Sequence, residues 1–142
     1  MSNFSAFFAQ NKLKPETIKL AVSTNFVDEN GKPLEWELRV LSASEDNQIR
    51  RASTHKVKSP GKSNVYTSEL DTNLYLSKMT AASVVYPDLN NAELQNSYGV
   101  MGADTLLEKM LSAGEYITLS SKVAEINGFT NSMDELVEEA KN

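Results

Sequence analysis

The stretch VDENGKPLEWELRVLSASE, residues 27–45, decides the fold, because a turn, a strand and a helix start follow one another within it. Asn30 and Gly31 tolerate the positive φ angles of a hairpin turn. After the turn, apolar residues alternate with charged ones, which is typical of a strand with one buried face. The apolar positions are Leu34, Trp36, Leu38 and Val40.

The segment before the turn has the same alternation. In TIKLAVSTNF, residues 17–26, one side carries Ile18, Leu20, Val22, Thr24 and Phe26. Two alternating runs joined by a turn predict an antiparallel β-hairpin, here over residues 17–41. Trp36, the only tryptophan, is expected to anchor this hairpin in the core, with a contact to another protein as the alternative.

The strand after the turn can end, and a helix can begin, within a few residues. Ser42 and Glu45 have the spacing of a capping box, in which each side chain binds the other residue's backbone N–H. Ser44 is the alternative cap. Acidic residues at this end and Arg50 and Arg51 at the other complement the helix dipole, so these charges are interpreted as structural.

Residues 43–142 are predicted to be helical, interrupted by a mobile polar loop at HKVKSPGKSNV, residues 55–65. One long helix is expected from Tyr66 to Pro87, with a core stripe at Leu70, Leu74, Ala81 and Val85. Shorter helices are predicted in NNAELQNSYG, ADTLLEKML, EYITLSSKVAEI and MDELVEEAK. Gly128 and then Phe129 suit a left-handed end of the third of these helices. The expected fold is α+β: an N-terminal antiparallel β-hairpin or small sheet packed with several helices, an all-helical C-terminal half, and a single domain over residues 1–142.

Three phenylalanines near the N-terminus form a separate apolar pattern. Phe4, Phe7 and Phe8 are spaced so that a short helix over residues 3–10 presents them on one face. Such a helix is too short to be stable alone in water, so it must dock on its own domain or on another chain. Docking within the chain is favoured, because exposed apolar patches are uncommon on monomers.

Composition and charge limit the class of protein. With 40% hydrophobic and 23% charged residues, the 142-residue chain is neither disordered nor a membrane protein. The start MSNFSAFFAQ lacks the basic region, apolar core and cleavage site of a signal sequence, and the chain has no cysteine, so we expect an intracellular location and no disulfides. The net charge of −5 is concentrated in the C-terminal third, whereas residues 50–62 are basic. This asymmetry leaves self-association or a charged partner open.

No reaction centre is visible. The GKS at residues 61–63 lacks the first glycine of a phosphate-binding loop, because Lys56 occupies that position. His55 is the only histidine, and no metal-binding spacing surrounds it. We therefore predict no enzyme activity, cofactor or metal. The basic segment 50–62 could contact phosphates, but the overall acidity opposes binding to nucleic acid.

Two longer segments carry a family resemblance. They are DENGKPLEWELRVLSASEDNQIRRAS and YPDLNNAELQNSYGVMGADTLLEKMLSAGEYITLSSKVAEINGF, residues 28–53 and 86–129. The recurrent elements include the NGKP turn, the W-E-L-R strand, the PDL-x-x-x-E-L-Q-x-SYG run, and L-x-A-G-E-Y followed by GF. On these elements, over most of its length, the chain resembles the XkdN-like tail assembly chaperones of long-tailed phages and prophages.

This resemblance implies a non-enzymatic role in virion assembly in the bacterial host cytoplasm. The chaperone is expected to bind the tail tape measure protein, to help recruit tail tube subunits, and to be absent from the mature virion. We expect no membrane association. A long apolar template would aggregate unless amphipathic surfaces covered it. The alternatives are a minor structural tail protein that stays in the virion, and a nucleic-acid-binding regulator that uses residues 50–62.

The resemblance brings no catalytic or ligand-binding residues. For partner binding, the apolar periodicity alone suggests that the N-terminal stripe and the last helices contact the tape measure protein or sister subunits. The residues in this hypothesis are Phe4, Phe7, Phe8, Tyr116, Met133, Leu136 and Val137.

Overall fold

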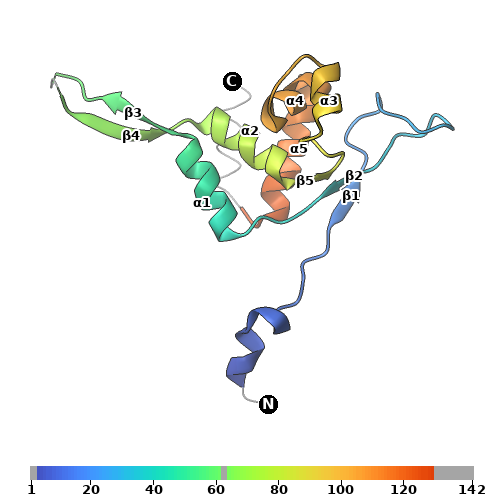
Figure 1. Cartoon of the computed structure of the whole chain (residues 1–142), viewed down its shortest axis with the longest axis horizontal. Helices are drawn as coiled ribbons and strands as arrows, with labels where there is room; N and C mark the ends of the chain where they lie inside the picture. Colours follow the sequence, from blue (N-terminus) through green and yellow to red (C-terminus); the bar gives the residue numbers. More distant parts are fainter. Residues whose placement is uncertain (1–2, 62–63, 130–142) are drawn as a thin grey trace.

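The computed structural model describes residues 3–61 and 64–129, which form two small antiparallel sheets and five α-helices (Figure 1). The α+β class predicted from the sequence is therefore confirmed. The elements are, in order, the 3-10 helices η1 (Asn3–Phe7) and η2 (Ala9–Asn11), then β1 (Ile18–Leu20), β2 (Trp36–Leu38), α1 (Ala43–Ala52), β3 (Thr54–Lys58), β4 (Tyr66–Leu70), α2 (Thr72–Ser83), β5 (Val84–Tyr86), α3 (Ala92–Ser97), α4 (Ala103–Met110) and α5 (Ala113–Ile126).

The predicted hairpin exists, with shorter strands than residues 17–41 suggested. β1 pairs antiparallel with β2, so that Ile18 lies opposite Leu38 and Leu20 lies opposite Trp36. β2 also pairs antiparallel with β5, which gives a three-stranded sheet in the order β1-β2-β5. The long connection between β1 and β2 ends in the predicted turn, where Gly31 has a φ of 79°.

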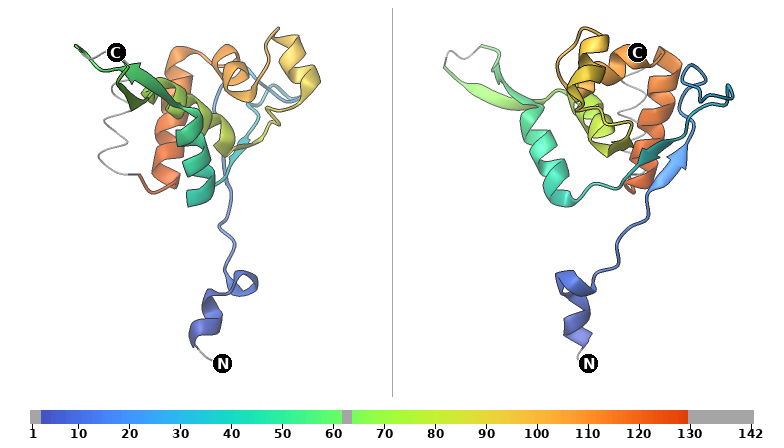
Figure 2. Two further views of the ribbon diagram at one scale, coloured as in Figure 1. Left: turned by 60° about the vertical axis from the view of Figure 1, so that its left-hand side comes forward. Right: turned by 45° about the vertical axis from the view of Figure 1, so that its right-hand side comes forward.

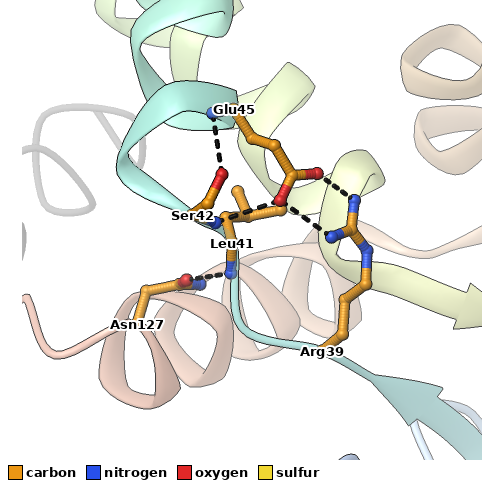
Figure 3. A network of polar contacts seen from close by, with 5 residues as sticks. All are labelled: Arg39, Leu41, Ser42, Glu45 and Asn127. Atoms are coloured by element: carbon orange, nitrogen blue, oxygen red, sulfur yellow. Dashed lines mark hydrogen bonds and ion pairs between the residues drawn. The ribbon is translucent and has the colours of Figure 1, made fainter. Parts of the chain in front are cut away.

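The junction between β2 and α1 follows the sequence prediction and adds an ion pair to it (Figure 3). The Ser42 hydroxyl accepts a hydrogen bond from the Glu45 N–H at 3.1 Å, and the Glu45 carboxylate accepts one from the Ser42 N–H at 3.0 Å. Arg39 binds the same carboxylate through both terminal nitrogens, at 3.1 and 2.6 Å. The acidic helix start thus also holds the end of the preceding strand.

The core is centred on α2, which contacts α1, α4 and α5. Tyr75, Leu76 and Met79 of α2 are buried, and so are Trp36 and Leu38 of β2. The facing helices complete the core with Leu106, Leu107, Leu119 and Val123. The predicted core role of Trp36 is confirmed.

Three strands interrupt the predicted helical region 43–142. The expected loop at residues 55–65 and the first residues of the expected long helix instead belong to the antiparallel hairpin β3–β4. Nearly all of its side chains are exposed, so no apolar alternation marked these strands. α2 begins only at Thr72, because the Asp71 carboxylate caps it by accepting from the Leu74 N–H.

The core stripe predicted for this long helix is confirmed only in part. Ala81 is buried and Leu70 packs against the core from β4, whereas Leu74 is half-buried. Val85 lies in β5 and is 42% exposed. β-branched and aromatic residues favour a strand at Val84–Tyr86, and the residue before Pro87 is disfavoured in a helix. β5 thereby becomes the third strand of the β1-β2-β5 sheet.

The last described helix ends as its sequence predicted. Gly128 has a φ of 79°, its N–H donates to the Glu125 carbonyl, and the Phe129 N–H donates to the Ala124 carbonyl. This is a Schellman end with an apolar residue after the glycine. The predicted helix MDELVEEAK lies outside the described residues. None of the helices within the described part has both the length and the apolar content needed to span a bilayer.

Candidate protein-binding surfaces

An aromatic element extends from the N-terminal side of β1. We call residues 3–17 the N-terminal arm; it consists of η1, η2 and an exposed linker, and it points away from the helices in every view (Figures 1 and 2). Phe4, Phe7 and Phe8 are 70%, 83% and 45% exposed. The expectation that this element docks within its own chain is therefore wrong.

The three rings form a small cluster. The ring centroids of Phe4 and Phe7 are 6.5 Å apart, and those of Phe4 and Phe8 are 5.7 Å apart with an edge-to-face geometry. The Asn11 side-chain amide donates to the Ser5 carbonyl at 2.7 Å and ties the two 3-10 helices together. The arm thus presents a preformed aromatic surface at the end of an exposed linker.

Tyr116, the other described residue of the partner-binding hypothesis, is in a different setting. It is half-buried on α5 against the core, and burial raises the pKa of its phenol. It lines a groove of about 630 Å³ formed by α2, α4 and α5. No residue of the arm lines this groove. Met133, Leu136 and Val137 lie outside the described residues.

A second apolar concavity surrounds Trp36, and sequence reasoning missed it. This Trp36 pocket has a volume of about 280 Å³. Trp36 is 2% exposed, whereas Leu34 and Tyr86 are 36% and 53% exposed, so we place Trp36 at the floor and the other two at the rim. The lining residues are Phe26, Leu34, Trp36, Tyr86, Pro87, Leu94, Ser97, Tyr98 and Met110.

Hydrogen bonds from Gln95 position the wall of this pocket that α3 provides. The Gln95 amide donates to the Leu89 carbonyl at 2.8 Å, and its oxygen accepts from the Gly102 N–H at 3.1 Å. α3 is thereby fixed between the segments before and after it. The lining residues come from separate segments without a common period, which explains why the sequence pattern did not indicate the pocket.

The β3–β4 hairpin forms a basic, exposed ribbon that extends from the helices (Figure 1). Lys56 lies opposite Ser68, and Lys58 lies opposite Tyr66. Side chains at alternate positions share a face of a strand, so the two lysines and Tyr66 lie on one face. Tyr66 is 58% exposed and adds an aromatic side chain to this basic face.

The polar cluster between α1 and α2 is structural. The Tyr75 hydroxyl donates to the Asp46 carboxylate, which also binds Arg50 at 2.8 Å. The Arg50 guanidinium lies 4.5 Å from the centre of the Tyr75 ring. Burial, and then the bond to Asp46, raise the pKa of Tyr75. Among the described residues, no group of three or more histidine, aspartate or glutamate side chains could hold a metal ion.

Comparison with known proteins gives these surfaces a biological setting. Residues 4–141 match the family model of the phage XkdN-like tail assembly chaperone protein. The chain belongs to the XkdN-like phage tail assembly chaperone family. The resemblance on which the sequence analysis relied is therefore confirmed.

Two relatives of this chaperone come from Bacillus subtilis strain 168. The phage-like element PBSX protein XkdN is 28% identical over 141 residues, which cover 99% of this chain and 94% of that protein. The uncharacterized protein YqbN is 26% identical over 141 residues, with 99% and 93% coverage. The crystal structure of YqbN superimposes with a TM-score of 0.75 and 21% identity over 92% of this chain and 99% of that chain, which shows a shared fold.

A tail assembly chaperone is a structural or chaperone-type protein that acts with tail proteins, so its surfaces matter more than any polar cluster. The structure separates the two predicted parts of the partner-binding surface that it describes: the N-terminal arm is exposed, whereas Tyr116 packs on the core. The N-terminal arm is thus the strongest candidate surface.

Proposed function

We propose that this chaperone binds the tape measure protein of its own phage or prophage through the N-terminal arm and helps to recruit tail tube subunits to it. The observation that carries the proposal is the exposed cluster of Phe4, Phe7 and Phe8 in a member of a tail assembly chaperone family. Contiguous exposed apolar patches on a protein of this size usually mark an interaction site. Before the tail tube assembles, a long and apolar tape measure protein is a partner that needs such a surface.

The size of the patch fits a reversible contact. Fully burying one phenylalanine side chain stabilises by about 1.5–3 kcal/mol. The rings are already partly covered, so three of them contribute roughly 4 kcal/mol before the entropy cost of association is subtracted. One arm therefore binds weakly, and many copies on one template are needed to cover it. Weak individual contacts let tube subunits displace the chaperone copy by copy.

The test is co-purification with the tape measure protein after combined substitution of Phe4→Ser, Phe7→Ser and Phe8→Ser. Because the rings are exposed, we expect tape measure binding to be lost while the melting temperature changes little. The matched control is Met101→Ser, which removes a 90% exposed apolar side chain between α3 and α4. Undiminished co-purification of the triple variant would refute the proposal.

We further propose that the chaperone works in the host cytoplasm and leaves before the virion is complete. The alternative role, a minor structural tail protein, predicts that the chain remains in purified particles. Mass spectrometry of purified virions separates the two: finding the chain at constant stoichiometry with tail tube subunits would favour the structural role.

The basic hairpin supports a second candidate function, nucleic-acid binding. The observation that favours it is that Lys56, Lys58 and Tyr66 share one face of the hairpin. The lysines could bind phosphates, and the tyrosine ring could stack on a base. The chain's net charge of −5 opposes this reading. A gel shift at low salt decides it, because any contact with phosphates is strongest there.

A further inference from the structure

We propose that, in the free chaperone, the N-terminal arm of one copy docks in the Trp36 pocket of a second copy, and that the two copies exchange arms reciprocally. The proposal concerns this chain alone and goes beyond tape measure binding. It joins two features of the same chain: an exposed aromatic cluster and an aromatic pocket.

The chemistry of the two features matches. The arm offers phenyl rings, and the pocket is lined by Phe26, Trp36, Tyr86 and Tyr98 together with aliphatic side chains. Aromatic pairs are favourable beyond the area that they bury. An apolar cavity of about 150 Å³ holds one benzene molecule. The Trp36 pocket, at about 280 Å³, therefore has room for roughly one or two rings of the arm.

The direction of the arm favours a second copy over its own pocket. In the antiparallel pair β1–β2, the arm leaves from the Ile18 end, beside Leu38, whereas Trp36 lies at the other end. Every view shows the arm pointing away from α3, which supplies one wall of the pocket (Figures 1 and 2). The linker 12–17, at about 3.3 Å per residue, spans roughly 20 Å and can reach a neighbour.

The area involved favours reciprocal exchange. A phenylalanine buries about 150–250 Å². With one or two rings inside the pocket and the rest against its exposed rim, covering the exposed parts of the three rings and the matching surface removes roughly 700–900 Å² in total for one arm. That is below the area of a stable interface, whereas two exchanged arms reach roughly 1,400–1,800 Å², within the usual range. Exchange of identical elements is a low-cost route to a two-fold dimer.

Trp36 makes the proposal measurable, because it is the only tryptophan and it lines the pocket. The experiment follows the mass by sedimentation, and the Trp36 emission, across a dilution series of the purified chain. We expect the mass to rise from 15.7 kDa towards twice that value with increasing concentration, and the emission to change over the same range. The combined variant Phe7→Ser and Phe8→Ser should remain a monomer with constant emission.

A variant of the Trp36 pocket provides the second part of the test. Ser97→Phe places a ring at an exposed lining position, so it should block the pocket and keep the chain monomeric without removing a core side chain. The Met101→Ser control should dimerise like the parent. Ser97→Phe should still co-purify with the tape measure protein, because its arm is intact. A failure of this proposal is therefore distinguishable from a failure of the proposed function.

Three results would overturn the exchange. The parent chain could stay a monomer at all concentrations. Self-association could survive both the arm and the pocket variants, which would place the interface elsewhere. An emission change on arm substitution that is the same at every concentration would show docking within one chain instead of between copies.

Discussion

The ion pair at the β2–α1 junction leads to a prediction that depends on pH. The bond to Arg39, and then the Ser42 N–H, lower the pKa of Glu45 from 4.5 to about 2. A carboxylate whose pKa is depressed in the folded state stabilises the fold above the unfolded-state pKa. This stabilisation is complete above roughly pH 5.5 and is lost as the pH falls from there through 2. Replacing Glu45 should therefore matter at neutral pH and much less in acid.

The size of this stabilisation follows from the pKa shift of Glu45 and from the exposure of its ion pair with Arg39. Lowering the pKa of Glu45 from 4.5 to about 2 corresponds to roughly 3.4 kcal/mol of folding free energy at full strength. The side chains of Arg39 and Glu45 are each 39% exposed, so solvent screening reduces this to about 1 kcal/mol. Glu45→Gln keeps a side chain that can complete the capping box but loses the charge. We expect it to lower the free energy of unfolding by about 1 kcal/mol at pH 7.

Urea unfolding of the parent and of Glu45→Gln, at several pH values from 7 to 3, measures the effect. More than half of the difference in unfolding free energy seen at pH 7 should be lost by pH 3. The control is Glu115→Gln in the second capping box, with Ser112, because no ion pair within residues 3–61 and 64–129 involves Glu115. A loss for Glu45→Gln that is equal at pH 7 and pH 3 would contradict the reasoning.

Three further predictions concern the core and two hydrogen bonds that hold its elements together. Leu106→Ala opens a cavity at a fully buried position and should cost about 3–5 kcal/mol in urea unfolding, whereas Met101→Ala, at an exposed position, should cost under ~0.5 kcal/mol. Tyr75→Phe removes the bond to Asp46 and should cost about 1–2 kcal/mol. Ultraviolet titration of the parent should show a phenol that ionises well above the ordinary tyrosine pKa near 10, and this phenol should be missing from Tyr75→Phe. Asn127→Ala should cost about 1–3 kcal/mol by the same urea assay, because the Leu41 N–H loses its acceptor at 2.8 Å, whereas Asn127→Asp keeps an acceptor and should cost less.

Local signals predicted the elements that they directly encode. The alternation around Trp36, the turn at Gly31, the Ser42–Glu45 cap and the end of α5 at Gly128 all have a short-range physical cause, and all four are present. The tether from Asn127 to the Leu41 N–H joins residues 86 apart, so no local pattern could reveal it (Figure 3). Contacts of this kind arise only once the helices have packed.

The errors also have physical reasons. The β3–β4 ribbon is exposed on both faces, so its strands lack the apolar alternation from which strands are recognised. Val84–Tyr86 continues an apolar helix without a break, and only pairing with β2 makes it a strand. The sequence indicated an aromatic surface at Phe4, Phe7 and Phe8 but favoured its docking within the chain, whereas the three rings are exposed. The Trp36 pocket needed the tertiary structure.

The proposed role of this chaperone is to cover an apolar tape measure protein and so keep it from aggregating. The most direct measurement is the soluble fraction of full-length tape measure protein when it is produced alone, with the parent chaperone, or with the combined Phe4→Ser, Phe7→Ser and Phe8→Ser variant. The account predicts a soluble complex only with the parent chain. Equal solubility of the tape measure protein in all three cases would contradict it.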